Sequence, residues 1–228
     1  MTAVLITGAN RGVGLALARQ YAGDGAEVIA CCRDPERADA LRELAASSAG
    51  GVRIWRLDVA DEGSIASLSR ALDRQPLDIL INNAAIANLS VDRIEAEGWI
   101  TTLRTNALAP MLIAQELREN LRRSFEKKLV VISSNFGSTS SAGGGSYAYR
   151  ASKAALNNGM RGLSRDWAHD GILVGILHPG WVRTDMGGGE VAAVSPEESA
   201  RGLIRRIAEL TPAASGCFQD YRGGAIRW

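Results

Sequence analysis

The sequence has few of the residues that build metal centres, disulfide frameworks or membrane spans. Its 228 residues include three cysteines and two histidines. The odd cysteine number and the lack of metal-ligand spacing argue against both a disulfide framework and a metal site. The longest apolar runs, such as Leu129–Ile132 and Ile172–Leu177, are far too short to span a bilayer. We therefore expect neither a metal ion nor a membrane as a partner.

An excess of charge of either sign is also missing. The 26 Lys and Arg residues against 25 Asp and Glu residues give a formal net charge of +1, so there is no electrostatic reason to expect nucleic acid as a partner. The chain enters a strand-like run at Ala3 without a basic segment or a cleavage site. With 46% apolar and 22% charged residues, the composition is typical of a globular protein, which we expect in the cytoplasm.

Strand-like and helical segments alternate along the whole chain. The expected strands are Val4–Thr7, Glu27–Cys32, Val52–Leu57, Leu77–Asn82, Lys128–Ser134, Ile172–Leu177 and a short one around Cys217–Gln219. Helical patterns separate them, among them a long one from about Glu97 to Arg123. The alternation, without repeats or a linker, predicts one α/β domain over residues 1–228 with a doubly wound, mostly parallel sheet of seven strands and helices on both faces. Ligands bind such sheets beyond the carboxyl ends of the strands.

Three expected helices begin with residues that cap helices well. Asp34 stands before Pro35, and Asp61 precedes a short helical pattern. Ser195, with Glu198 three residues later, has the spacing of a capping box. We expect each of these side chains to accept a hydrogen bond from the first turn of its helix.

Three glycines, Gly8, Gly12 and Gly14, lie in the first expected strand-to-helix turn. A dinucleotide site needs glycines there for a tight turn, for close approach of the backbone to a pyrophosphate, and for close packing of the helix on the strand. The spacing is G-x-x-x-G-x-G, not the commoner G-x-G-x-x-G. The strand before and the helix after the loop favour a phosphate site over an ordinary loop.

Tyr149 and Lys153 stand four residues apart at the start of another helical pattern, on one helix face. A nearby ammonium favours the phenolate, so we expect the pKa of Tyr149 to fall below its usual value of about 10. Such a tyrosine can exchange a proton near neutral pH. Tyr147 lies six residues from Lys153, roughly 240° around the helix, and should face elsewhere. Most pairs with this spacing are ordinary surface residues, so other motifs must decide.

Several motifs occur together in one order. Thr7–Gly14 reads TGANRGVG, Asn82–Ala85 reads NNAA, Tyr149–Lys153 reads YRASK, and Pro179-Gly180 follows the sixth expected strand. With this order and spacing the chain resembles the short-chain dehydrogenase/reductase family over essentially its whole length. The stretches SYAYRASKAALN and HPGWVRTDMGG, with the closing residues Cys217–Trp228, are most similar to the C-factor and sniffer-like carbonyl reductase branch. The resemblance implies a single-domain Rossmann fold that binds a nicotinamide cofactor.

The resemblance also implies where the cofactor lies. Asp58 and Val59 match the positions that border the adenine, and Asn82 and Ala84 match those along the adenosine ribose. Ala85 replaces the family's usual glycine. The full implied set of cofactor-binding residues is Gly8, Asn10, Arg11, Gly12, Val13, Gly14, Arg33, Asp58, Val59, Asn82, Ala84, Tyr149, Lys153, Pro179, Gly180, Val182 and Thr184.

The end of the second expected strand indicates which nicotinamide cofactor is preferred. An acid there would accept hydrogen bonds from the ribose 2′-hydroxyl and would repel a 2′-phosphate. Here the strand ends in Cys32-Arg33, and Arg33 can bind phosphate, with Arg11 as a second positive charge. Asp34 is the competing candidate for the ribose, but its context gives it a role as a helix cap. We therefore expect NADP(H) in preference to NAD(H).

The resemblance implies four catalytic residues. Ser134 would hold the substrate oxygen and Tyr149 would protonate it. Lys153 would hold the nicotinamide ribose and lower the Tyr149 pKa, and Asn106 would anchor a water that links Lys153 to solvent. Ser133 and Ser134 point to opposite sides of a strand, so only one faces the site. The family pattern favours Ser134, but its separation from Tyr149 is longer than the commonest one, which leaves Ser133 open.

Three large apolar residues, Phe136, Trp181 and Met186, are candidates for the substrate pocket, although a simple role as hydrophobic cover is equally compatible with the sequence. Three glycines at 187–189 indicate a small lid at about 185–197. His178 is a candidate for a catalytic acid or base, but a structural role explains it better. The sequence thus predicts an NADPH-dependent enzyme that reduces an aldehyde, ketone or quinone to an alcohol, or catalyses the reverse reaction.

The main alternative is a catalytically quiet dinucleotide-binding protein of signalling or redox sensing, as in the C-factor branch. The intact set of Asn106, Ser134, Tyr149 and Lys153 favours the enzyme, because a sensor needs only the glycine loop. The short chain after Thr184 disfavours a sugar-nucleotide epimerase. Assembly into a homodimer or a homotetramer is open, since the long helices pair subunits in many relatives of the family.

Overall fold

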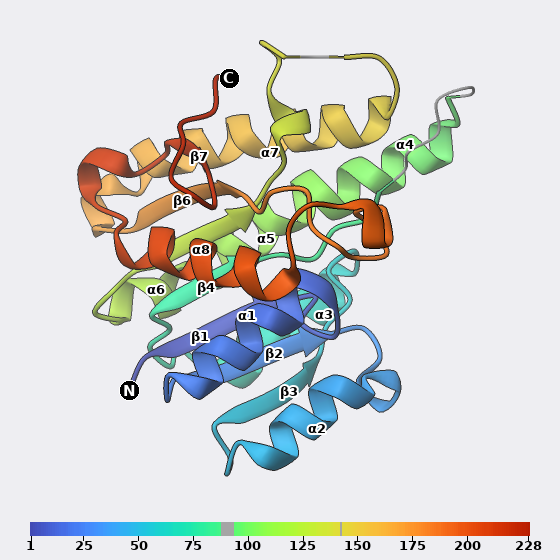
Figure 1. The fold of residues 1–228 in the computed structure, drawn as a ribbon. Helices are drawn as coiled ribbons and strands as arrows, with labels where there is room; N and C mark the ends of the chain where they lie inside the picture. The colour runs from blue at the N-terminus through green and yellow to red at the C-terminus, as the bar shows by residue number, and fades with distance from the viewer. Residues whose placement is uncertain (88–93, 142) are drawn as a thin grey trace.

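A parallel sheet forms the central layer of the molecule (Figure 1). The computed structural model describes residues 1–87, 94–141 and 143–228, and in these residues seven strands pair in the order β3-β2-β1-β4-β5-β6-β7. Every named pair of strands is parallel. The strands are β1 Ala3–Thr7, β2 Glu27–Cys32, β3 Val52–Arg56, β4 Ile79–Asn82, β5 Lys128–Ile132, β6 Leu173–His178 and β7 Phe218–Asp220. The expected doubly wound α/β fold is confirmed.

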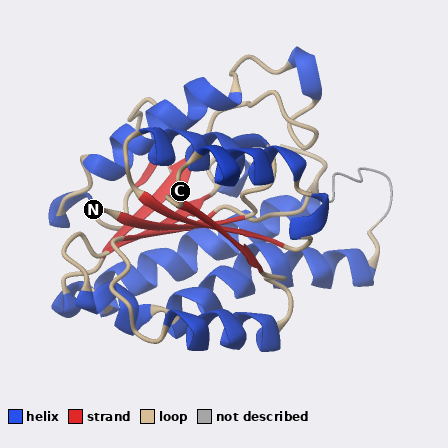
Figure 2. Ribbon diagram, turned by 90° about the horizontal axis from the view of Figure 1, so that it is seen from below, coloured by secondary structure: helices blue, strands red, loops and turns tan. Residues whose placement is uncertain are grey.

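Helices cover both faces of the sheet (Figure 2). Helices α1 (Gly12–Gly23), α2 (Asp39–Ser47) and α8 (Pro196–Ala208) contribute to the hydrophobic core on one face. The core on the other face is built with α3 (Glu62–Leu72), α5 (Ala109–Glu116), α6 (Arg118–Arg123) and α7 (Tyr147–Asp166), and α4 (Ala96–Leu103) packs against α7. Of the helices within the described residues, none is both long and apolar enough to cross a membrane.

The central strands are apolar at consecutive positions because both of their faces are covered. On β1, Val4 and Ile6 enter the core below α1, whereas Leu5 enters the core below α5 and α7. Cys31 and Cys32 on β2 divide in the same way, and both are buried free thiols. The two adjacent cysteines are thus small core residues on opposite faces of the sheet.

The expected continuous helix from Glu97 to Arg123 is wrong. A π-helical turn at Arg104–Leu108 separates α4 from α5, and α6 begins after a break at Leu117, whose φ and ψ are −101° and 10°. Pro110 explains the first interruption. It has no N–H to donate to the carbonyl of Asn106 four residues earlier, so the regular ladder fails at this point. The hydrophobic pattern continues through these breaks, which is why the sequence reads as one helix.

Two of the three expected helix caps are present. The Asp61 Oδ1 atom accepts a hydrogen bond from the Gly63 N–H at 2.9 Å, and the Ser195 Oγ atom accepts one from the Glu198 N–H at 3.1 Å. The second half of the capping box is missing, because the Glu198 carboxylate instead accepts a hydrogen bond from the hydroxyl of Tyr221 at 3.2 Å.

The expected cap at Asp34 is wrong. Pro35 begins a short 3₁₀ turn over Pro35–Arg37, and α2 starts only at Asp39. The Asp34 side chain makes no capping hydrogen bond and lies 3.9 Å from the guanidinium of Arg37. The sequence argument assumed that a role as helix cap would keep Asp34 from binding a ligand at the end of β2. Without that cap, Asp34 is available there.

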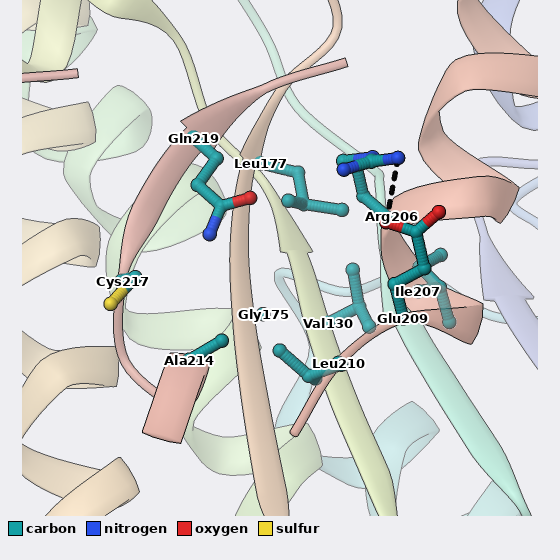
Figure 3. A pocket seen from close by; sticks show the side chains of 10 residues that line it. All are labelled: Val130, Gly175, Leu177, Arg206, Ile207, Glu209, Leu210, Ala214, Cys217 and Gln219. Carbon is teal, nitrogen blue, oxygen red and sulfur yellow. Dashed lines mark ion pairs between the residues drawn. The ribbon is translucent and has the colours of Figure 1, made fainter. Parts of the chain in front are cut away.

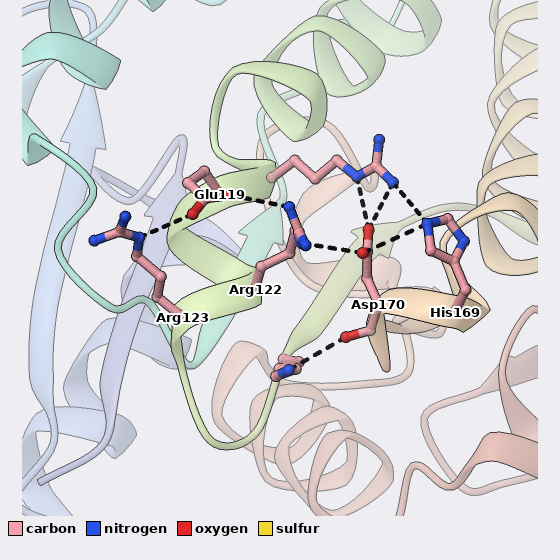
Figure 4. Close-up of polar contacts among 7 residues, drawn as sticks. Glu119, Arg122, Arg123, His169 and Asp170 are labelled. Atoms are coloured by element: carbon pink, nitrogen blue, oxygen red, sulfur yellow. Dashed lines mark hydrogen bonds and ion pairs between the residues drawn. The ribbon is translucent and has the colours of Figure 1, made fainter.

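A buried carboxylate ties α6 to the end of α7 (Figure 4). The side chain of Asp170 is 4% exposed and accepts hydrogen bonds from the Arg118 Nε and Nη2 atoms at 2.9 and 2.6 Å. The Arg122 guanidinium lies 3.0 Å away and also contacts Glu119. Burial raises the pKa of Asp170, but the hydrogen bond and charge of Arg118, with the charge of Arg122, hold it below its ordinary value. His169 lies at the exposed edge of this cluster, with its side chain 69% exposed.

Candidate active site

The glycine loop packs directly on the turn that follows β4. Gly8 has a φ of +65°, and a Cβ atom on it would lie 2.9 Å from the Cα of Ala84. A Cβ on Gly14 would overlap the carbonyl oxygen of Gly8 and would lie 2.5 Å from the Asn83 amide nitrogen. Gly12 has a φ of +55°, and a Cβ atom on it would lie 3.0 Å from the methyl carbon of Thr184. The three glycines are therefore required by close contacts, as the spacing predicted.

Two residues that the sequence did not assign to the site hold these turns together. The hydroxyl oxygen of Thr7 accepts hydrogen bonds from the N–H groups of Asn83 and Ala84, both at 3.0 Å. The Asn83 side chain donates to the carbonyl oxygens of Thr7 at 2.9 Å and Gly8 at 3.1 Å. Two features of the sequence could have identified these residues: a Thr directly before the first glycine, and a second Asn directly after Asn82, each at the end of a strand.

The start of α1 is suited to binding an anion. This twelve-residue helix has no side chain that caps its first turn and no acidic residue within it. Its first N–H groups and the positive end of its dipole therefore point to the site beyond β1. Arg11 precedes the helix and forms an ion pair with Asp185 from the segment after β6, although both side chains are largely exposed.

A buried amide beside the glycine loop has no partner. Asn82, at the end of β4, is 3% exposed, and within the described residues neither its Oδ1 nor its Nδ2 atom makes a hydrogen bond. Unpaired buried polar atoms are costly, and few occur in native proteins. The uncapped helix, the close glycine turns and this amide together fit a dinucleotide laid across the ends of β1 and β4.

The expected adenosine end of the site lies along β2 and β3. Arg33, just after β2, is exposed, and Asp34 next to it is exposed as well. The Asp58 carboxylate accepts a hydrogen bond from the Ala60 N–H at 2.9 Å, and Val59 is buried. The structure thus presents one cation and one carboxylate side by side where the ribose 2′-position is expected.

Tyr149, Lys153 and Ser134 converge from two elements. Tyr149 and Lys153 lie on α7, with the Lys153 Nζ atom 5.8 Å from the centroid of the Tyr149 ring. Ser134, two residues beyond β5, lies near enough to Tyr149 for its side chain to lower the pKa of the phenol, while its hydroxyl oxygen accepts a hydrogen bond from the Phe136 N–H at 3.2 Å. Ser133 points the other way, and its hydroxyl donates to the Oδ1 atom of Asn157 at 2.5 Å. Of the two serines, Ser134 is therefore the one beside Tyr149.

The expected fall in the Tyr149 pKa is wrong for this structure. Burial raises the pKa of Tyr149, and the nearby Ser134 side chain offsets this only in part. The buried ammonium of Lys153 makes no hydrogen bond to the phenol within the described residues and donates instead to the carbonyl oxygen of Ile132 at 2.8 Å. Burial also lowers the pKa of Lys153 to about 8. The phenol is thus protonated at neutral pH.

Asn106 lies in the π-helical turn and is 1% exposed. Its side chain is fully engaged: Oδ1 accepts from the Ile86 N–H at 2.9 Å, and Nδ2 donates to the Ile86 carbonyl at 2.8 Å and to the Ser152 hydroxyl at 3.0 Å. Ser152 in turn donates to the carbonyl oxygen of Tyr149 at 2.7 Å. The amide therefore joins the turn after β4 to the helix of Tyr149, and Ser152 is a site residue that the sequence analysis missed.

Comparisons with known proteins agree with this arrangement. A family model described as short chain dehydrogenase matches residues 2–194. The chain belongs to the short-chain dehydrogenase family. The C-signal protein of Myxococcus xanthus is 38% identical over 156 residues, which cover 67% of this chain and 93% of that protein.

Two solved structures are similar over the whole length of the chain. The NADPH-bound carbonyl reductase from chicken fatty liver has a TM-score of 0.91 and 33% identity, and the match covers 100% of this chain and 99% of the other. The carbonyl reductase Sniffer of D. melanogaster has a TM-score of 0.90 and 30% identity, with both chains fully covered. The expected resemblance to the C-factor and sniffer-like branch is confirmed.

The segment after β6 closes over the glycine loop of this short-chain dehydrogenase. Gly180 has a φ of +87°, and a Cβ on it would lie 2.8 Å from the Tyr221 ring. Val182 forms a parallel bridge with Val194. The indole of Trp181 donates a hydrogen bond to the carbonyl of Gly187. These contacts fold residues 181–194 into a loop whose ends are joined, with Thr184 beside Gly12.

The expected pocket residues are only partly covered. Phe136 is 36% exposed and stands edge-on to Tyr149, with ring centroids 6.2 Å apart. Trp181 and Met186 are 56% and 36% exposed, and Tyr147 is exposed away from the Lys153 side chain. His178 is largely buried, and its Nδ1 atom has no hydrogen-bond partner among the residues that the structure describes. Burial lowers its pKa to about 4 despite the nearby charge of Asp220. It is therefore a neutral residue at neutral pH.

A separate cavity of about 140 Å³ lies between α8 and strands β5 to β7 (Figure 3). Leu177 and Val130 line it from the sheet, and Ile207 and Leu210 line it from the opposite side. None of its lining residues belongs to the predicted active site, and its one charged pair, Arg206 with Glu209, is mutually neutralised at 2.7 Å. The chemistry of this family member is therefore to be sought at the carboxyl ends of the strands and not in this cavity.

Proposed function

We propose that this short-chain dehydrogenase is an NADPH-dependent oxidoreductase that reduces the carbonyl of an aldehyde, a ketone or a quinone to an alcohol. The observation that carries the proposal is the pair on α7, in which the ammonium of buried Lys153 lies 5.8 Å from the centroid of the half-buried Tyr149 ring. The raised pKa of Tyr149 keeps the phenol protonated at neutral pH. A protonated phenol is the form needed to protonate a carbonyl oxygen. In the reverse direction the same group acts as the base.

The cofactor is assigned from the fit of the residues beyond β1, β2 and β4. The pyrophosphate would lie at the uncapped start of α1, and the Asn82 amide would gain partners from the adenosine half. Arg33 and Arg11 favour a 2′-phosphate, and Arg37 offsets the charge of Asp34. The similarity to an NADPH-bound carbonyl reductase supports the same choice. When bound, NADPH supplies the hydride that, with one proton, converts C=O into CH–OH and leaves NADP⁺.

The residues of the chain divide the remaining work. The Ser134 hydroxyl orients the substrate oxygen, and Tyr149 donates the proton to it. Lys153, still mostly charged at pH 7 with a pKa of about 8, holds the nicotinamide ribose and stabilises the phenolate that forms. The Asn106 side chain already donates hydrogen bonds to Ile86 and Ser152. We therefore assign its part in the proton route to its backbone carbonyl, which cannot accept a hydrogen bond from Pro110 because proline has no N–H.

The segment at about 185–197 is proposed as a small lid within a single domain of residues 1–228. It contains three consecutive glycines and lies between Thr184, which faces the glycine loop, and the start of α8. Its ion pair from Asp185 to Arg11 crosses from the lid to the phosphate end of the site. Pro179, Gly180, Val182 and Thr184 would meet the nicotinamide half, with Trp181 and Met186 toward the substrate.

The test is NADPH consumption with a panel of aldehydes, ketones and quinones, together with Tyr149→Phe. Phenylalanine removes only the hydroxyl, so we expect a folded protein that still binds NADPH and loses turnover by about 100-fold or more. Full turnover in a folded Tyr149→Phe protein would remove the mechanism. Tyr147→Phe is the matched control, because Tyr147 lies two residues away and is exposed.

The same panel separates the enzyme from its alternative, a catalytically quiet dinucleotide-binding signalling protein. The observation that supports this alternative is the similarity to the C-signal protein of Myxococcus xanthus. Tight NADPH binding without turnover of any panel member would favour it. The complete set of Ser134, Tyr149, Lys153 and Asn106 favours turnover.

A further inference from the structure

Arg150 borders the space next to the proposed reaction centre. It follows Tyr149 in the first turn of α7, and its guanidinium carbon lies 4.0 Å from the centroid of the Phe136 ring. The same ring stands at 71° to the ring of Tyr149, 6.2 Å between centroids. Phe136 therefore has Arg150 over its face and Tyr149 at close contact, which groups a cation, an aromatic wall and the phenol in one place.

The guanidinium is held by the chain around it. Its Nε atom donates to the carbonyl oxygen of Gly145 at 3.1 Å. A Cβ on Gly143 would lie 3.3 Å from the Nη2 atom, so the loop before α7 passes close to the planar group. Contact with the Phe136 face fixes the plane further, since a guanidinium stacks favourably on an aromatic ring.

Arg150 has no acidic partner in the described residues. The ion pairs of the structure engage Arg11, Arg37, Arg104, Arg118 and other arginines, but not Arg150. The side chain is half-buried, so its charge is less hydrated than on an open surface. An oriented, partly desolvated guanidinium without a counter-ion is suited to bidentate binding of a carboxylate.

Resting on the proposed carbonyl reduction, we propose that Arg150 sets substrate specificity by binding a carboxylate on the substrate. The substrates are then aldehyde or keto acids, with the carbonyl at Ser134 and Tyr149 and an apolar body between the two ends. Phe136, Trp181 and Met186 supply exposed apolar surface for that body. The guanidinium does not enter the chemical step; it selects and orients the molecule that reacts.

The test uses two substrates that share one reacting group, 4-carboxybenzaldehyde and its methyl ester, with NADPH as reductant. We expect the wild-type kcat/KM to be about tenfold or more higher for the acid, which corresponds to the strength of one charge-assisted contact. Arg150→Gln is expected to bring the ratio of acid to ester close to one, mainly through KM for the acid. Arg165→Gln, an exposed arginine at the far end of α7, is the control for net charge and should keep the wild-type ratio.

A second variant and a salt series distinguish a lost contact with the substrate carboxylate from a folding defect in the loop before α7. Arg150→Lys keeps the charge but loses the planar fork, so the ratio should fall between those of the wild type and Arg150→Gln. In the wild-type protein the ratio should fall as NaCl rises, because the site is partly open to solvent. An acid-to-ester ratio near one in the wild type, or an unchanged ratio in folded Arg150→Gln, overturns the assignment. If the wild type reduces neither compound nor any other carbonyl, the proposed function itself fails.

Discussion

Asn157 is predicted to hold the reaction centre in place without touching a substrate. It lies one helical turn after Lys153 and is 1% exposed. Its Oδ1 atom accepts from Ser133 at 2.5 Å, and its Nδ2 atom donates to the carbonyl of Gly137 at 3.3 Å. These two contacts lie on either side of Ser134, so Asn157 fixes the loop that presents the Ser134 hydroxyl.

The expected cost of Asn157→Ala follows from the two groups that lose a partner. The Ser133 hydroxyl and the Gly137 carbonyl would both be left buried and unpaired, at about 1–3 kcal/mol each. We expect the free energy of unfolding to fall by about 2–6 kcal/mol, a large share of the about 5–15 kcal/mol typical of domains. In protein that remains folded, kcat should fall about tenfold or more while KM changes less, because Ser134 loses its position for the reaction.

Urea unfolding followed by tryptophan fluorescence measures the stability, with five tryptophans as probes. Asn158→Ala is the matched control, since Asn158 is an exposed neighbour on the same helix. A double-mutant cycle with Ser133→Ala should show coupling of about 0.5–3 kcal/mol, as for residues in direct contact. Equal losses in the Asn157 and Asn158 variants, or strict additivity in the cycle, would refute the reasoning.

Three further predictions concern charge. For carbonyl reduction, kcat/KM should decline as pH rises through about 8, where buried Lys153 loses its charge while Tyr149 stays protonated; a rate that increases through this range contradicts the assignment. NADPH should bind more tightly than NADH, and Arg33→Ala should erode that preference, whereas a clear NADH preference in the wild type would show that Asp34 prevails. The Asp170→Asn variant should be less stable by about 1.5–3 kcal/mol, measured by urea unfolding. Because the folded-state pKa of Asp170 is lowered, its contribution is present above the usual carboxyl pKa and is lost as pH falls through the folded value; a variant as stable as the wild type at pH 7 would contradict this.

The strands and the glycine loop could be predicted because their causes are local. A run such as Val28–Cys32 is apolar on both faces, which marks a central strand wherever it occurs. Gly8 and Gly12 adopt positive φ, and this need is visible in the residue type itself. Ser195 and Asp61 cap their own helices within three residues. Each of these features is decided by a few neighbouring positions, so pattern and propensity are sufficient.

The parts that the sequence did not predict depend on residues far apart in the chain. Thr7 binds the turn after β4, and Asn106 joins Ile86 to Ser152, pairings that no spacing rule reveals. The cap at Asp34 failed for the opposite reason. A favourable local pattern was overridden, since the chain turned in a 3₁₀ helix and α2 began later. Contacts between distant residues therefore decided the first two features.

The sign of the Tyr149 pKa shift shows how far a local pattern can mislead about chemistry. Four residues of helix do place the ammonium of Lys153 near the phenol, at 5.8 Å from its ring centroid. The fold, however, buries both groups and turns the ammonium to the carbonyl of Ile132, so burial raises one pKa and lowers the other. The pair therefore starts as a protonated phenol beside a buried ammonium whose pKa is lowered to about 8. A protonated phenol is the form that can donate a proton to a carbonyl oxygen, as the proposed reduction requires.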